Sequence, residues 1–138
     1  MQKTYRLFIS HAWRHHDDYD RLINLLKNSP YFMWQNYSRP KDRPLVNPNH
    51  PSSHAYLSAK LADQIRPVHC VVVLAGIYAT YSEWIQEEID IARRMGKPII
   101  GVRPWGSMHI SNPVRDAAAE VVGWQTGSII EAIRRNSL

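Results

Sequence analysis

Trp84 and Glu88 are the residues whose types and spacing most clearly allow chemistry, and they lie four residues apart within the stretch 82–89, SEWIQEEI. On a helix, this spacing places the indole and the carboxylate on one face, one above the other. A carboxylate beside an aromatic wall suits stabilisation of a cationic, sugar-like transition state, or orientation of ribose hydroxyls, as in glycosidic cleavage. A structural interpretation stays open, because glutamate favours helices and a Glu87-Glu88 pair near a helix N-terminus interacts favourably with the helix dipole.

The seven histidines do not form a metal-binding pattern. His11, His15 and His16 lie close together in the chain, but no second cluster with ligand spacing accompanies them, so we expect no metal site. His11 follows an expected strand, where it either lines a crevice or satisfies local backbone groups. We expect His69, within another expected strand, to be a satisfied core or edge residue.

Short apolar runs alternate with helical patterns along the chain, which is typical of β-α units and a parallel sheet. The run from Val68 to Ala75 is the most hydrophobic and is rich in valine, as expected of a central strand buried on both faces. The expected strands are Tyr5–Ser10, Phe32–Tyr37, Val68–Ala75, Pro98–Val102 and Glu120–Trp124.

Four helices are expected between and after these strands. The first begins near Asp17 or Asp18 and ends at Asn28, and the second runs from about Ser53 to Arg66. Capping-box patterns predict the starts of the other two, at Thr80 with Glu83 and at Ser128 with Glu131. Between the second strand and the second helix, the segment Ser38–Ser53 contains four prolines, and loops of such length are often functional.

Open parallel sheets bind ligands beyond the carboxyl ends of their strands, at the point where the strand order reverses. The segments that follow the expected strands are polar, aromatic and basic. They include Ser10–Trp13, Tyr37–Arg39, Gly76–Thr80 and Arg103–Trp105. Tryptophans at such places either stack on a base or pack loops onto the sheet, and both interpretations stay open.

Composition limits the classes of protein. The 138 residues fit one domain, 1–138, and 44% hydrophobic residues are enough for a globular core. The longest nearly apolar run is too short to span a bilayer, and the N-terminus has no signal-peptide pattern, so we expect a cytoplasmic protein. A net charge of +5 favours an anionic partner, but the basic residues do not cluster, so we expect no nucleic-acid binding.

Several sequence motifs are absent. The chain contains no Gly-x-Gly-x-x-Gly and no Gly-x-x-x-x-Gly-Lys, which excludes the usual dinucleotide and triphosphate loops. A nucleophile elbow is also missing, so serine hydrolase chemistry has no support. The single cysteine, Cys70, cannot form an internal disulfide, and we expect it to fill core space.

Three features together resemble a Toll/interleukin-1 receptor (TIR) domain: FISH at 8–11, the proline-rich loop after the second strand, and WIQEEI at 84–89. More narrowly, FISHAW at 8–13, DYDRL at 18–22 and WQNYS at 34–38 resemble the TIR-like family that includes the Thoeris anti-phage protein ThsB. The resemblance covers nearly the whole chain. It implies an α/β, three-layer, flavodoxin-like fold with a five-stranded parallel sheet in the order 2-1-3-4-5.

The resemblance also implies an activity. Catalytic TIR domains cleave NAD, as a substrate and not a cofactor, at the nicotinamide-ribose bond. Thoeris members resemble cyclases whose cyclic ADP-ribose-like messenger diffuses to a separate effector protein and activates it. The family's catalytic glutamate, four residues after a tryptophan, corresponds to Glu88. Two positions depart from relatives: Ile85 stands where many have cysteine, and Ala12 stands where other TIR branches have arginine.

Beside the resemblance, we hypothesise further roles for residues near the expected strand ends. Ser10 is expected to donate to a ribose or phosphate, and Arg39 or Arg103 to meet the pyrophosphate. The pocket walls are expected to be His11, Trp13, Tyr37 and Trp84. The loop Ser38–Ser53 corresponds to the segment through which TIR domains assemble, which implies self-association.

Two alternatives of other classes stay open. Many TIR domains are non-catalytic modules that scaffold signalling partners. A nucleotide-binding sensor without turnover would use the same fold. Tight NAD binding without nicotinamide release would favour the sensor over the enzyme.

Overall fold

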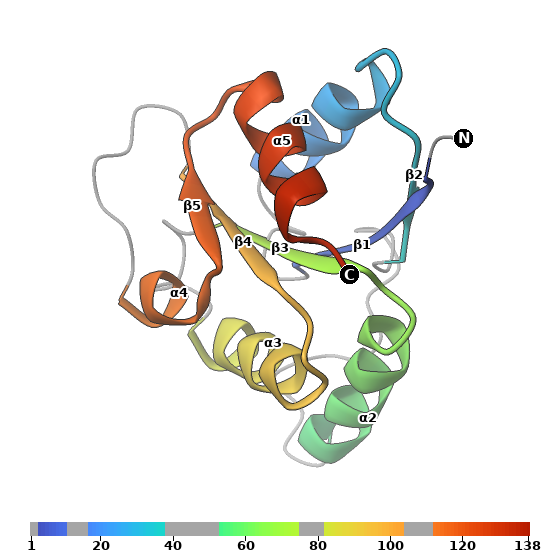
Figure 1. Cartoon of the computed structure of the whole chain (residues 1–138). Coiled ribbons are helices and arrows are strands. Elements are labelled where there is room, and N and C mark those ends of the chain that lie inside the picture. Colours follow the sequence, from blue (N-terminus) through green and yellow to red (C-terminus); the bar gives the residue numbers. More distant parts are fainter. Residues whose placement is uncertain (1–2, 11–16, 38–52, 75–81, 104–111) are drawn as a thin grey trace.

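The computed structural model describes residues 3–10, 17–37, 53–74, 82–103 and 112–138. Strands and helices alternate along this part of the chain (Figure 1). In chain order they are β1 Tyr5–Ile9, α1 Asp17–Lys27, β2 Trp34–Asn36, α2 Ser53–Ile65, β3 Cys70–Leu74, α3 Ser82–Arg94, β4 Ile99–Val102, α4 Asn112–Ala117, β5 Glu120–Val122 and α5 Thr126–Asn136.

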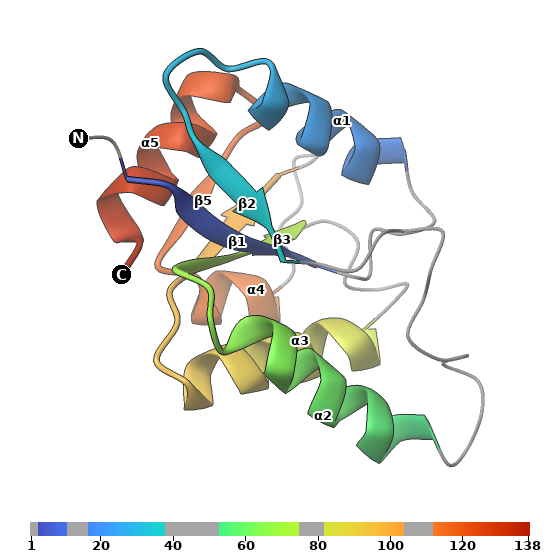
Figure 2. The same cartoon turned by 90° about the vertical axis from the view of Figure 1, so that its right-hand side faces the viewer.

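The strands form a parallel sheet in the order β2-β1-β3-β4-β5, which confirms the predicted flavodoxin-like α/β fold. Helices α1 and α5 cover one face, and α2, α3 and α4 cover the other, giving three layers (Figures 1 and 2). The register aligns Leu7 with Cys70 and Val72 with Ile100. Because every strand pair is parallel, the carboxyl ends of all five strands lie at one edge of the sheet.

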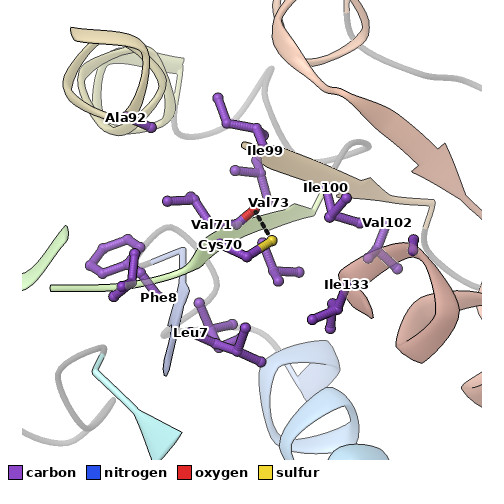
Figure 3. Close-up of a cluster of buried hydrophobic side chains, with 14 of the residues drawn as sticks. Leu7, Phe8, Cys70, Val71, Val73, Ala92, Ile99, Ile100, Val102 and Ile133 are labelled. Atoms are coloured by element: carbon purple, nitrogen blue, oxygen red, sulfur yellow. Dashed lines mark hydrogen bonds between the residues drawn. The ribbon is translucent and has the colours of Figure 1, made fainter. Parts of the chain in front are cut away.

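The core follows from the apolar character of β1 and β3. Leu7 and Phe8 are both fully buried although neighbouring residues of a strand point to opposite faces. Figure 3 shows Phe8 toward the α3 side, where Ala92 lies, and Leu7 on the side of Ile133 in α5. β3 is buried on both faces, as predicted, and its Cys70 fills core space.

The structure differs from the predicted elements in three places, namely at α4, in β2 and at the start of α5. Helix α4 was not predicted. Its six residues carry a proline, and among those whose burial the structure describes one apolar side chain, Val114, is fully buried, which is too little for a helical period. β2 is shorter than expected. Phe32 packs its ring on Tyr5, with 5.5 Å between centroids, so its burial reflects turn packing and not a strand.

The predicted capping box at Ser128 and Glu131 is wrong. Helix α5 begins at Thr126 after Gln125, and no side chain caps it. Ser128 lies inside the first turn, where its Oγ donates to Gln125 Oε1 at 3.4 Å, and Glu131 instead pairs with Arg134. Buried residues from Ile129 to Ile133 hold the helix against the core, so packing sets its position without a cap.

The remaining boundaries agree to within two residues where they can be compared. Thr80 and residues 38–52 of the proline-rich loop lie outside the described residues. No helix in the described ranges combines the length and apolar character needed to cross a bilayer.

Candidate functional site

Ser10 and Glu88 form a buried polar pair. In the part of the chain that the structure describes, these are the two polar side chains classed as buried, each with 0% exposure. The Ser10 hydroxyl donates a hydrogen bond to Glu88 Oε1 at 2.5 Å. Two residues 78 positions apart in sequence are thus joined at the point where β1 ends.

Strand and helix periodicity bring the pair together. Ser10 lies two residues after Phe8 and therefore on the same face of the sheet, the one that α3 covers. Its N–H donates to the Val72 carbonyl at 3.0 Å, which continues the β1-β3 pairing one residue beyond the strand. Glu88 lies one helical turn before Ala92, on the buried stripe of α3.

A carboxylate is unusual at this position. The neighbouring buried residues of the same helix, Ile89, Ile91 and Ala92, are apolar, and glutamate is almost never fully buried unless it is paired. Burying an ionised carboxylate costs several kcal/mol unless hydrogen bonds compensate. A bond from a hydroxyl to a charged acceptor returns about 1.5–3 kcal/mol. Buried charges held in this way are candidates for functional groups.

Glu87, the next residue, has a different environment. It is only partly buried, and its Oε1 accepts a hydrogen bond of 2.5 Å from the Ser58 hydroxyl of α2. This contact ties α3 to α2, which is a structural role. Two consecutive glutamates of α3 therefore each accept a hydrogen bond from a serine. Glu88 does so beside the sheet edge, and Glu87 does so between α2 and α3.

Tyr37 and Arg103 also lie at the carboxyl edge of the sheet. Tyr37 follows β2, its N–H donates to the Leu7 carbonyl at 2.8 Å, and it packs partly buried against the core. Arg103 follows β4, its N–H donates to the Val122 carbonyl at 2.8 Å, and it is half-buried. Tyr37 follows β2, which pairs with β1, the strand that leads to Ser10, whereas Arg103 follows β4, on the far side of β3.

A sequence-family model described as "Thoeris protein ThsB, TIR-like domain" matches residues 8–109. The chain belongs to this TIR-like family. The matched range contains both Ser10 and Glu88, so the buried pair is part of the TIR-like domain. No curated protein matches the chain.

Solved structures agree with the TIR-like domain at the level of the fold. A conserved protein from Enterococcus faecalis V583 has a TM-score of 0.63 at 10% identity, over 96% of this chain and 99% of that one. A 2-deoxyribosyltransferase from Bacillus psychrosaccharolyticus has a TM-score of 0.58 at 12% identity, over 90% of this chain and 89% of that one. The CMP N-glycosidase BcmB from Clostridium botulinum has a TM-score of 0.51 at 16% identity, over 94% of this chain and 98% of that one.

Several predicted site residues of the TIR-like domain stay predictions. His11, Trp13 and Arg39 lie outside the described residues, and Trp84 lies in α3 with a side chain that is not described. The structure therefore brings together two of the predicted residues, Ser10 and Glu88.

The contact between them was not anticipated from the sequence. Ser10 was expected to donate to a ligand, whereas its hydroxyl donates to Glu88. The sequence signal for this contact is the alternation that places Ser10 on the face of Phe8, combined with the buried stripe of α3.

His69 and Cys70 have the structural roles predicted for them. The Arg6 N–H donates to His69 Nδ1 at 2.9 Å, and burial, followed by the charge of Arg6, lowers the pKa of His69. Burial raises the pKa of the Cys70 thiol to about 12. His69 is thus a neutral acceptor beside β1, and Cys70 is a core residue.

Proposed function

We propose that this TIR-like domain cleaves NAD at the nicotinamide-ribose bond and uses Glu88 as the catalytic carboxylate. The products are nicotinamide and a cyclic ADP-ribose-like nucleotide, which diffuses to a separate effector protein in Thoeris anti-phage defence. The observation that supports this proposal most directly is the buried Glu88, held by Ser10 at the carboxyl edge of the sheet.

A single carboxylate is enough for this reaction. When the bond between C1′ and the nicotinamide nitrogen breaks, both electrons leave with nicotinamide, which departs neutral because it was cationic in NAD. No general acid is required, unlike in ordinary glycosidases. The ribose gains oxocarbenium character, which the negative charge of Glu88 stabilises. A nucleophilic atom of the adenosine part of the same molecule then forms the new bond to C1′, and a proton is released; attack by water instead gives ADP-ribose and also releases a proton.

The other predicted residues complete the proposed pocket. Tyr37, His11, Trp13 and Trp84 are proposed to form its walls, and Arg39 or Arg103 to contact the pyrophosphate. The positions of Arg103 after β4 and of Tyr37 after β2 support this part of the proposal. The same fold is used by a 2-deoxyribosyltransferase and by an N-glycosidase, which is a likeness of fold and not of site.

Access to Glu88 requires a conformational change. At 0% exposure, no atom of NAD can touch the carboxylate in this conformation. We therefore assign turnover to a state in which the residues covering Glu88 have moved, and propose that self-association through Ser38–Ser53 favours it. The same burial favours a second candidate, a non-catalytic TIR module in which Glu88 never meets a ligand.

One experiment separates the two candidates. Purified protein is incubated with NAD, with and without a crowding agent that promotes assembly, and mass spectrometry follows nicotinamide and nucleotide products. Glu88→Gln should abolish nicotinamide release, whereas Glu87→Gln, its matched neighbour, should retain it. The mass of the product distinguishes a cyclic nucleotide from ADP-ribose. Stable self-association without nicotinamide release in either condition would favour the non-catalytic module.

A further inference from the structure

The Ser10-Glu88 hydrogen bond assigns Ser10 a place in the reaction. We propose that Ser10 is a positioning residue, which holds the Glu88 carboxylate charged and correctly oriented for the departing nicotinamide. This inference rests on the proposed function. It differs from the role expected from the sequence, because the serine proton is directed to the carboxylate instead of to the ribose or phosphate of NAD.

The sheet fixes the position of the Ser10 hydroxyl. β1 is paired with β2 on one side and β3 on the other, and the Ser10 N–H is itself bonded to Val72. A serine side chain has one rotatable bond that moves its oxygen, whereas a glutamate has three that move its carboxylate. The less mobile partner therefore constrains where Oε1 of Glu88 lies.

The environment makes this donor chemically important. The loss of a hydrogen-bond donor makes a buried carboxylate easier to protonate, and a neutral acid cannot stabilise an oxocarbenium ion. A hydrogen bond to the ionised form favours the charge. A carboxylate has about four lone-pair sites, so a donor at Oε1 does not by itself prevent a ribose hydroxyl from binding the same group.

The Ser58-Glu87 pair provides a matched control. It has the same residue types, the same 2.5 Å distance and an adjacent position on α3, but it joins two helices away from the sheet edge. If Ser10 only satisfies a buried polar group, removing either hydroxyl should affect stability and leave kcat for NAD cleavage equally unaffected. If Ser10 positions Glu88, the two variants should differ in kcat.

The test compares Ser10→Ala, Ser10→Thr and Ser58→Ala in the full chain. Nicotinamide release gives kcat and KM for NAD, and circular dichroism with thermal unfolding confirms the fold of each variant. We expect Ser10→Ala to lower kcat by about tenfold or more, because a misplaced catalytic group loses orientation, with KM changed by less than about threefold. Ser10→Thr, which keeps the hydroxyl, should restore most of kcat, and Ser58→Ala should stay within about twofold of wild type.

Each outcome decides between distinct conclusions. A wild-type kcat in Ser10→Ala, or equal losses in Ser10→Ala and Ser58→Ala, would overturn the role of Ser10 while leaving NAD cleavage intact. No nicotinamide release by the wild type in any condition would overturn the proposed function, and the role of Ser10 with it. If Ser10→Ala does not fold, Ser10→Cys, which keeps the shape but donates weakly, must show the loss of kcat for the role to stand.

Discussion

At the scale of single residues, the buried charge of Glu88 should lower the free energy of unfolding relative to a neutral side chain of the same shape. Such a cost is expected when a charged group is retained for catalysis. Its amide counterpart has nearly the same shape but no charge to desolvate. We expect Glu88→Gln to raise the free energy of unfolding by about 1 kcal/mol, while it removes nicotinamide release. Urea denaturation measures this change.

The control for this prediction is Glu87→Gln, which alters a partly buried group and should change the free energy of unfolding by less than about 0.5 kcal/mol. A loss of more than about 2 kcal/mol in Glu88→Gln would contradict the prediction. Such a loss would mean that the charge of Glu88 holds the fold together.

His69 should make stability depend on pH. Its pKa lies below the ordinary value of 6.5, first because of burial and second because of Arg6. The unfolded chain therefore binds the proton at a higher pH than the native chain does. The contribution of His69 is present above pH 6.5 and is lost as the pH falls through the lowered native value.

The measurement is the thermal midpoint at pH 7.5 and 5.5. His69→Asn keeps an acceptor near the Nδ1 position but does not titrate, so the difference between the two midpoints should be smaller in this variant than in the wild type. An unchanged difference would assign the acid sensitivity to other groups.

The sequence allowed Glu88 and Ser10 to be predicted as site residues, but not the hydrogen bond between them. Glu88 was indicated by its spacing from Trp84 and by the family resemblance, both of which are local features. The bond from Ser10 depends on where α3 packs on the sheet, and a distance across 78 residues has no local signature.

At the scale of elements, Gly101 allows α4 to pack closely on β4. A β-carbon at this position would lie 3.0 Å from Val114 Cγ1 and 3.1 Å from Val121 Cγ2. We expect Gly101→Ala to destabilise the protein by about 1–3 kcal/mol, because the nearer neighbour, Val114, is fully buried and has little room to move. Chemical denaturation measures the loss.

Gly127, in the first turn of α5, is the matched control. Apart from its chain neighbours and the backbone of its own helix, no atom of the described residues lies within 4 Å of the place where a β-carbon would stand. Gly127→Ala should therefore stabilise the protein by about 0.5–1 kcal/mol. Equal changes in the free energy of unfolding for the two substitutions would show that α4 shifts to accommodate the added methyl group.

The elements that could be predicted were those whose own residues carry the signal. β3 has a continuous valine-rich run, and α3 has a regular buried stripe that includes Ile89 and Ala92. α4 is held by one buried valine against Gly101, and the start of α5 is set by packing and not by a cap. Tertiary contacts determine such short or uncapped elements, and these contacts are not visible in a local pattern.

At the scale of the whole molecule, we propose that the reaction depends on more than one copy of the chain. Arg43 lies in the Ser38–Ser53 segment that we propose for self-association. Reversal of its charge in Arg43→Glu should abolish assembly, measured by light scattering, and should reduce nicotinamide release together with it. An unchanged particle size would remove this segment from the assembly interface.

The position of Cys70 gives the protein an internal reporter of unfolding. It is the single cysteine, fully buried in β3, and its thiol has a pKa of about 12. Only the thiolate reacts with alkylating reagents, so labelling near pH 8 should require opening of the sheet. The rate of alkylation in the native protein therefore measures how often the centre of the sheet opens, without any engineered label. Because NAD bound to the native state would suppress that opening, the same rate should report substrate binding even in a variant that cannot turn it over.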